Sequence, residues 1–522
     1  MAININHQTD TISASGGTLN LTGFSGGGGS FSSDADKNLV AGTSAGAALD
    51  GTSGCYNVFL GCGAGKAVTS GNGNVYLGCD AGDSNTTGSR NVAIGKGAAD
   101  SHTAGSQNVF LGHYAGRGVS GSQGCNVIIG AASGQSQLCY STIVGTRAGG
   151  ENSSSTCCNT FLGYQAGYYN LGKSNTAIGV NAGRRTQGDC SIAIGFEAGE
   201  CVKGAHNISM GYYSLKGGTG GVTGLENIAI GREAGKCMTS GCDNVFLGTY
   251  AGIGNTTASG NIFIGHKSGS QTFDGSYDDG GCNIAIGFEA GCRLNGSGYS
   301  AAEYNINIGY KAGADAYNNA AAAADYNIFM GYCAGTTSSG SKNIGLGCKT
   351  GASSGGECNV TIGNCTGTGT YGDENVFIGH LAGKVNADGE KNVFLGTCAG
   401  NTNTSGDCNI AIGFDVELPS ATGNNQFAIG SGTNRWIYGD SSYNIYDKDG
   451  NQLNGAGGGG GGGITVQDEG SSLSTTATTL NFVGSGVAAS GSGATKTITI
   501  SGGGGGSGVS QAKATAIAMI FG

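Results

Sequence analysis

A five-residue phrase recurs along most of the chain and constrains the fold more than any other feature. It reads Asn-Val-Phe-Leu-Gly at 57–61, Asn-Val-Tyr-Leu-Gly at 74–78 and Asn-Val-Ala-Ile-Gly at 91–95. Related phrases occur 23 times between Asn38 and Gln426, usually followed by two variable residues and Ala-Gly. Most intervals are 16 or 17 residues. A period of this length is typical of proteins built from stacked repeats.

The positions of each unit are numbered here from the first residue of the phrase. The second and fourth positions are almost always Val, Ile, Leu or Met, whereas the third varies among Phe, Ala, Ser, Asn, Thr and Gly. This alternation predicts a short β-strand whose second and fourth side chains face the core. The third side chain is expected on the opposite face, whose surroundings accept side chains of different size and polarity. The fifth position is Gly in every unit, which indicates a positive φ or a close approach of two chain segments.

A strand this short cannot bury an apolar face alone, so successive units are expected to stack about 4.8 Å apart. The first-position Asn then recurs in register, and its side-chain amide is expected to bond from one rung to the next. The sequence therefore predicts an all-β protein, a parallel β-solenoid (β-roll) of 23 rungs over residues 38–430. Its length would be roughly 110 Å.

Composition excludes several other classes of protein. Glycine accounts for 109 of 522 residues, but a single proline excludes collagen, and regular apolar bursts exclude a flexible linker. A net charge of −10 without a basic cluster argues against nucleic acid as a partner. No apolar run is long enough to cross a bilayer, and residues 1–10 lack the pattern of a secretory signal. We therefore expect no membrane insertion and no export by the usual signal route.

The rungs are thin, which predicts association of several copies. Our preferred state is a parallel homotrimer that buries the third-position faces of neighbouring chains. The alternative is that these rings form a second apolar layer inside a monomer. The rings in question are Phe59, Phe110, Phe161, Phe246, Phe263, Phe377 and Phe394.

Composition changes outside the repeats suggest separate end segments. They are an N-terminal β cap or attachment segment at 1–37, a capping and aromatic segment at 431–454, a Gly linker at 455–463, a small β module at 464–501, and a Gly linker with an apolar tail at 502–522.

Two regions are candidates for receptor contact. Three successive intervals of 22 residues between Asn261 and Asn327 contain insertions, and insertions in solenoids often form a binding face. Tolerated loop drift explains them equally well. The second region carries the only tryptophan. Its aromatic side chains are expected either to cap the last rung or to form a flat surface that binds saccharides, and we prefer capping. The candidate contacts are Phe273, Tyr277, Asp278, Asp279 and Tyr299 in the first region, and Arg435, Trp436, Tyr438, Tyr443 and Tyr446 in the second.

The sequence shows no pattern of catalytic or metal-ligating residues. The 19 cysteines include no Cys-x-x-Cys pair, and the six histidines are scattered. Cys62 and Cys79 follow the fifth-position Gly of adjacent units. They are read either as small packing residues or as an inter-rung disulfide. We expect no enzyme activity and no cofactor or metal.

The phrases at 91–95, 191–195 and 227–231 resemble the head repeats of trimeric autotransporter adhesins, which are trimers of left-handed parallel β-rolls. The adhesin repeat is shorter. The present sequence also shows no signal peptide, coiled-coil stalk or membrane anchor, and these differences weaken the match.

The longer phrase with Ala64-Gly65 is similar to repeats in tail-fibre and related virion structural proteins of tailed bacteriophages, particularly marine ones. The blocks at 434–442, 464–470, 493–500 and 512–522 are similar to parts of the same proteins. This resemblance implies a homotrimeric fibre on a virion that contacts other tail or baseplate proteins and a host surface glycan or protein. The alternatives are a bacterial surface adhesin and, less favoured, a polysaccharide-degrading enzyme on a solenoid.

Overall fold

The structure is a computed structural model, and it describes the shaft almost completely together with short strands near both ends. The described residues are 3–6, 11–14, 32–33, 36–119, 124–135, 138–151, 156–218, 220–270, 280–293, 302–315, 324–454, 467–468, 471–472, 487–490, 495–500 and 519–520.

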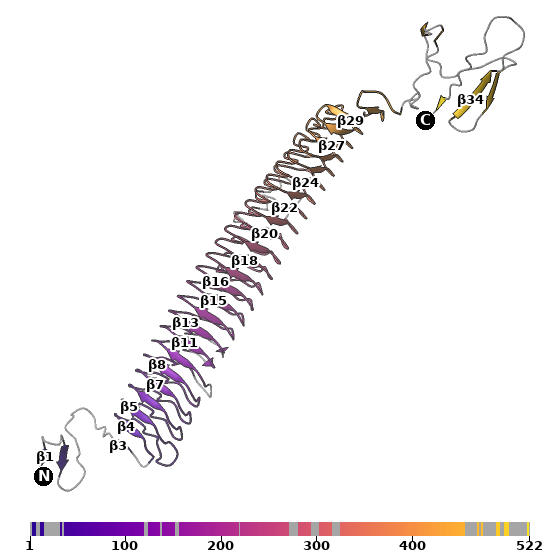
Figure 1. The fold of residues 1–522 in the computed structure, drawn as a ribbon. Coiled ribbons are helices and arrows are strands. Elements are labelled where there is room, and N and C mark those ends of the chain that lie inside the picture. The colour runs from indigo at the N-terminus through magenta and orange to yellow at the C-terminus, as the bar shows by residue number, and fades with distance from the viewer. Residues whose placement is uncertain are drawn as a thin grey trace, which may run out of the picture.

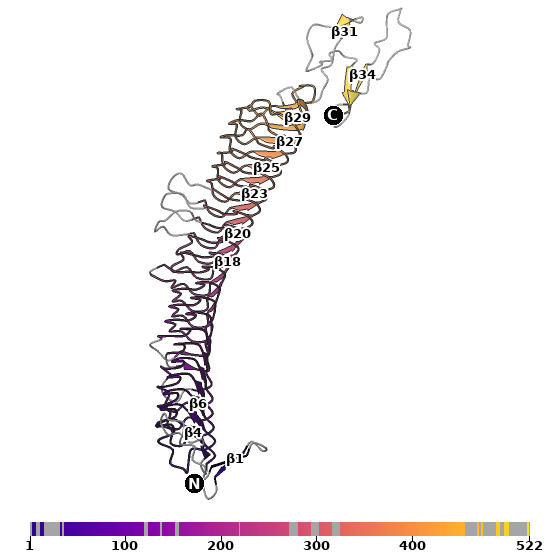
Figure 2. The same ribbon diagram turned by 90° about the vertical axis from the view of Figure 1, so that its left-hand side faces the viewer.

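The shaft is one continuous parallel β-sheet with one short strand from each repeat (Figure 1). Each of the first 22 of its 23 strands pairs in register with the strand of the next repeat, as Val58 does with Val75 and Leu60 with Leu77. The strands stack along one side of the rod and the turns lie on the other (Figure 2). The predicted all-β parallel β-solenoid is therefore confirmed.

The shaft strands have the following bounds: β4 (Leu39–Ala41), β5 (Val58–Leu60), β6 (Val75–Leu77), β7 (Val92–Ile94), β8 (Val109–Leu111), β9 (Val127–Ile129), β11 (Thr142–Val144), β13 (Thr160–Leu162), β14 (Thr176–Ile178), β15 (Ile192–Ile194), β16 (Ile208–Met210), β17 (Ile228–Ile230), β18 (Val245–Leu247), β19 (Ile262–Ile264), β20 (Ile284–Ile286), β21 (Ile306–Ile308), β22 (Ile328–Met330), β23 (Ile344–Leu346), β24 (Val360–Ile362), β25 (Val376–Ile378), β26 (Val393–Leu395), β27 (Ile410–Phe414) and β28 (Phe427–Ser431). A separate parallel pair, β10 (Leu138–Cys139) and β12 (Thr156–Cys157), lies in the turns of two adjacent rungs.

The prediction about the two strand faces was wrong. The third-position side chain points inward: Phe59, Phe161 and Phe394 are each 0 % exposed, whereas the second and fourth positions are half-buried or exposed. The seven third-position rings expected between chains therefore lie in the chain's own core. The reason is the turn after the strand, because the Ala-Gly segment folds back over the third side chain. The eighth-position Ala64 is likewise fully buried.

The interior is only wide enough for one large ring per rung. A Cβ added to Gly65 would lie 2.8 Å from the Phe59 ring of its own rung, so the ninth position must be Gly beside such a ring. Rings on adjacent rungs stack, with centroids 5.1 Å apart for Phe59 and Tyr76 and 4.9 Å apart for Phe377 and Phe394. These stacked pairs are separated along the core by rungs whose third residue is small or aliphatic, such as Ala93 and Ile128.

The fifth-position Gly is required by both conformation and space. Gly61 has φ +139°, a value that L side chains rarely adopt, and an added Cβ would lie 2.4 Å from the carbonyl oxygen of Gly78 on the next rung. The predicted close approach is therefore an approach between successive rungs.

A column of buried first-position residues ties each rung to the next. Asn227 donates its backbone N–H to the Asn207 side-chain oxygen at 2.9 Å. Its own side-chain oxygen accepts a hydrogen bond from the backbone N–H of Asn244 at 3.0 Å. Its side-chain amide also donates to the Gly241 carbonyl at 2.9 Å and to the Asn207 side-chain oxygen at 3.1 Å. Direct amide–amide bonds thus occur, but the recurrent link runs from backbone to side chain.

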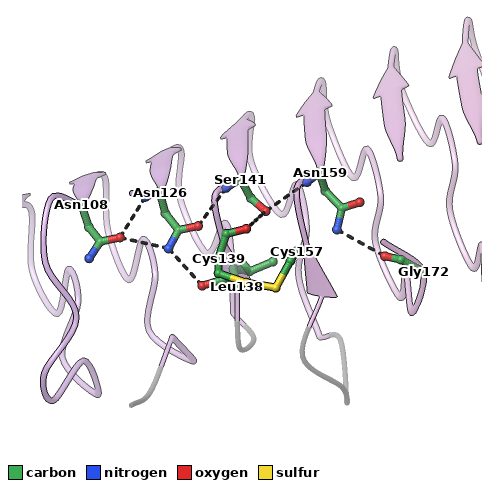
Figure 3. Close-up of a disulfide and its surroundings, with 8 residues drawn as sticks. All are labelled: Asn108, Asn126, Leu138, Cys139, Ser141, Cys157, Asn159 and Gly172. Carbon is green, nitrogen blue, oxygen red and sulfur yellow. Dashed lines mark hydrogen bonds between the residues drawn. A yellow bond between two sulfur atoms is a disulfide. The ribbon is translucent and has the colours of Figure 1, made fainter. Parts of the chain in front are cut away.

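Serine can replace asparagine in this column. Ser141 donates its backbone N–H to the Asn126 side-chain oxygen at 3.0 Å, and its hydroxyl oxygen accepts the Asn159 backbone N–H at 3.2 Å (Figure 3). A short hydroxyl is therefore sufficient to continue the chain of hydrogen bonds.

Antiparallel strands cover the two end rungs of the shaft. At the C-terminal end β28 pairs with β29 (Asn434–Gly439), which pairs with β30 (Ile445–Asp447). At the other end β3 (Ser32–Ser33) pairs antiparallel with β4. A covered edge cannot template another parallel strand.

The remaining described strands belong to the terminal segments. β1 (Ile3–Asn6) pairs with β2 (Thr11–Ala14), β31 (Gln467–Asp468) with β32 (Ser471–Ser472), and β34 (Thr495–Ile500) with β33 (Val487–Ser490) and β35 (Met519–Ile520), all antiparallel. The predicted Gly linker at 455–463 and residues 501–518 lie outside the described residues.

The buried asparagine column gives a direct stability test. Asn375→Ala removes the acceptor of the Asn392 backbone N–H and the donor to the Gly389 carbonyl. Each buried group left unpaired costs about 1–3 kcal/mol. We expect faster amide exchange across β24, β25 and β26 and a lower urea midpoint. Asn364→Ala, which removes an exposed side chain nearby, is the control and should leave both unchanged.

Candidate functional site

Clusters of metal-ligating side chains are the first feature to consider in the part of the chain that the structure describes. Among these residues, no three His, Cys, Asp or Glu side chains lie close enough together to hold a metal ion. The described residues also contain no helix of the length and apolar character that a bilayer span requires. Candidate functional features are therefore surfaces.

The largest such surface is the outward side of the sheet, called here the outer face and defined by the second- and fourth-position side chains of β4 to β28. No charged residue occupies either position in any of the 23 strands. Leu111, Leu247 and Leu395 are 41–43 % exposed there. The fourth position is apolar in every strand and the second is apolar except at Thr142, Thr160 and Thr176, so an uncharged, mainly apolar band runs along the shaft.

The size of the outer face is unusual for a single chain. Strands about 10 Å wide and about 4.8 Å apart give an area of about 1,000 Å² over the whole shaft. Isolated soluble chains seldom expose contiguous apolar patches above a few hundred Å². A stable interface buries about 800 Å² on each partner. The outer face thus has the area and chemistry of a protein–protein interface.

An aromatic column borders the outer face at the sixth position. The rings of His266, Phe288, Tyr310 and Tyr332 stack on four successive rungs, with centroids 5.1–5.2 Å apart and nearly parallel planes. Phe196 and Tyr212 stack in the same way at 5.4 Å. The sequence analysis missed this column, although the residue after each fifth-position Gly could have revealed it.

The stacking determines what this aromatic column can bind. Each internal ring has both faces covered by its neighbours, so the edges meet solvent and the faces do not. The apolar face of a sugar ring packs on the face of an aromatic ring, so this column is poorly suited to saccharide stacking. Its position beside the outer face fits the rim of an interface instead.

The structure divides the predicted contacts of the capping segment into two groups. Arg435 donates to the Glu417 and Leu418 carbonyls at 2.8 and 3.1 Å and lies over the Tyr438 ring, which stacks on Tyr446 at 4.9 Å. These three side chains hold the cap together. Trp436 and Tyr443 are 67 % and 69 % exposed and are available for contacts.

The other predicted contacts, Phe273, Tyr277, Asp278, Asp279 and Tyr299, lie outside the described residues. The described residues that precede the three inserted segments occupy one corner of successive rungs. Arg293 donates its backbone N–H to the Ser270 carbonyl at 3.0 Å and its guanidinium to Asp315 at 2.6 Å. The described residues that come directly before the three insertions therefore lie next to one another on successive rungs.

The cysteines occupy several different environments. Cys139 and Cys157 form a disulfide between adjacent rungs beside the first-position column (Figure 3). Cys62 and Cys79 are free thiols, and the hydrogen bond to Asp80 raises the pKa of Cys79. Among the free cysteines that the structure describes, Cys292 alone is buried. The interpretation as a buried packing residue therefore fits Cys292. Cys62 and Cys79 are neither buried nor linked by a disulfide in the structure.

Comparisons with known proteins give no family for this chain, so a functional assignment rests on the geometry of its surfaces. No protein-family model, curated protein or solved structure matches the chain.

One buried histidine makes the shaft sensitive to pH. The ring nitrogens of His102 lie 2.9 Å from the Gly105 carbonyl oxygen and 3.2 Å from that of Val119, and the side chain is fully buried. Desolvation lowers the pKa of His102 below its ordinary value of 6.5, outweighing the two carbonyl contacts that raise it. The buried ring therefore stays neutral at pH 7.

Because the pKa of His102 is lower in the folded chain, the unfolded chain binds protons more readily below about pH 6.5. The rungs around β7 and β8 should therefore lose stability as the pH falls from 7.5 to 5.5. Hydrogen exchange, corrected for intrinsic rates, measures this loss. His102→Asn reproduces the local bond of Asn85 to Gly88 and should remove the pH effect in these rungs. An unchanged pH effect in that variant would assign it to another group.

Proposed function

We propose that this chain is a structural fibre protein of a phage virion, built as a parallel homotrimer and used in host attachment. The observation that carries the proposal is the outer face, an uncharged and mainly apolar band along the whole shaft. Three copies with their outer faces turned inward would cover this band and bring the sixth-position aromatic columns to the seams.

This proposal replaces the interface expected from the sequence. Third-position rings cannot join chains because they are buried in each chain's own core. The outer face takes their place, because its side chains point away from the core. A footprint of about 1,000 Å² per chain exceeds the about 800 Å² per partner that a stable interface buries, and its apolar side chains favour association.

The virion and attachment parts of the proposal rest on the resemblance to phage tail-fibre repeats. In this arrangement the shaft holds the two ends of the fibre apart. Other tail or baseplate proteins bind one end, and exposed residues such as Trp436 and Tyr443 contact a host glycan or protein. A bacterial surface adhesin is the alternative. Antibodies against the shaft should label thin fibres on virions and block adsorption, whereas labelling of the cell envelope would favour the adhesin.

The trimer has a direct test in solution. Sedimentation equilibrium of the full chain should give three times the 51.2 kDa of one copy, and negative-stain images should show rods about 100 Å long. Leu111→Lys, Leu247→Lys and Leu395→Lys together should yield folded monomers, because each lysine would have to be buried without a partner.

The matched control carries three lysines on the turn side of the shaft. Thr87, Ser240 and Ser405 are exposed there, and their replacement by Lys should leave the trimer intact. Circular dichroism should show unchanged β content in both variants. A monomeric parent chain, or a trimer that survives the three lysines on the outer face, would contradict the proposed interface.

A further inference from the structure

A groove of about 630 Å³ lies on the turn side of the shaft, away from the outer face. It spans five successive rungs. One wall is a column at the eleventh position, where Glu151, Tyr169, Arg185 and Cys201 follow one another on adjacent rungs. The groove therefore runs parallel to the rod and is built from regularly spaced side chains.

Backbone bonds hold this wall rigid. Tyr169, Arg185 and Cys201 each donate a backbone N–H to the preceding rung, at 3.1, 2.8 and 2.9 Å. All three residues have φ between +58° and +63°, which marks a sharp corner of the chain. The side chains at this corner therefore have a repeated, well-defined spacing.

A longer rung closes one end of the groove. The interval from Asn207 to Asn227 is 20 residues, and the extra length lies after Lys216. Gly217 donates to the Glu200 carbonyl at 3.0 Å, and Val222 forms a parallel bridge with Val202. A Cβ on Gly221 would lie 2.7 Å from the Cys201 carbonyl oxygen, so this residue packs closely on the preceding rung.

The carboxylates of the groove are already engaged. Glu200 is 7 % exposed and lies 3.1 Å from the Lys216 ammonium and 3.6 Å from the Arg184 guanidinium. Lys216 also pairs with Glu197. Glu151 accepts a hydrogen bond of 2.7 Å from the Tyr169 hydroxyl.

The cations Arg185 and Lys203 have a different environment. Both side chains are exposed, and neither forms an ion pair within the part of the chain that the structure describes. They line the same groove from adjacent rungs. A protein with a net charge of −10 thus keeps two available positive charges together in one groove.

We propose that this groove binds an acidic oligosaccharide, with uronate carboxylates on Arg185 and Lys203. A guanidinium matches a carboxylate in a two-pronged hydrogen bond, and an ammonium adds a second charge-assisted contact. Gln187 lies along the same groove, and its exposed side-chain amide provides a partner for sugar hydroxyl groups. The volume suits a ligand of about two or three sugar rings. A groove open along the rod also fits a segment of a linear polymer.

This inference names the receptor class for the proposed attachment function and rests on that function for its biological meaning. Calorimetric titration of the full chain with trigalacturonate should show binding that weakens when NaCl rises from 20 to 300 mM. Maltotriose, a neutral trisaccharide, should bind at least tenfold more weakly. Sodium sulfate tests for simple anion binding.

Arg185→Gln with Lys203→Gln should weaken trigalacturonate binding at least tenfold. The control, Lys66→Gln with Lys342→Gln, removes the same charge at exposed sites elsewhere and should have no effect. Absence of trigalacturonate binding, equal binding of sulfate at the same residues, or equal weakening in both double variants would overturn the saccharide site. A trimeric rod with any of these results would leave the fibre proposal standing.

Discussion

The whole shaft depends on the hydrogen bonds that join each rung to the next. A rung has about 17 residues and a three-residue strand, so it has no stable structure in isolation. Strand pairing, the close approach of Gly61 to Gly78 and the buried column through Asn227 all act between rungs. Each of these contacts requires the same register of the strand and the turn after it, whereas the rest of the rung varies in length.

This stacking produces two very different surfaces from one strand. The third side chain enters a core that is one ring wide, which explains why Phe, Ala and Gly all occur there while the ninth position beside a large ring is Gly. The second and fourth side chains form the outer face. On the turn side, the same regular spacing aligns the eleventh-position residues into the wall of a groove. Periodicity thus creates both proposed binding surfaces.

Sequence reasoning predicted the architecture because period and register are written in the repeats. It was wrong about which face of the strand is buried, because Val or Ile on one face and Phe or Ala on the other are all apolar. It named Trp436 and Tyr443, which are exposed, together with Arg435, Tyr438 and Tyr446, which hold the cap. It missed the Cys139–Cys157 disulfide, because the pairing depends on two turns meeting at β10 and β12.

The sequence by itself determined the fold class, the number of rungs, and their register, because the recurring phrase of apolar residues, Asn and Gly stacks in register only one way. Only the tertiary structure decided which strand face is the core. The physical reason is the path of the Ala-Gly turn, which folds over the third position and leaves the second and fourth outside. It also decided that Arg185 and Lys203, 18 residues apart, line one groove while the nearby carboxylates are already paired.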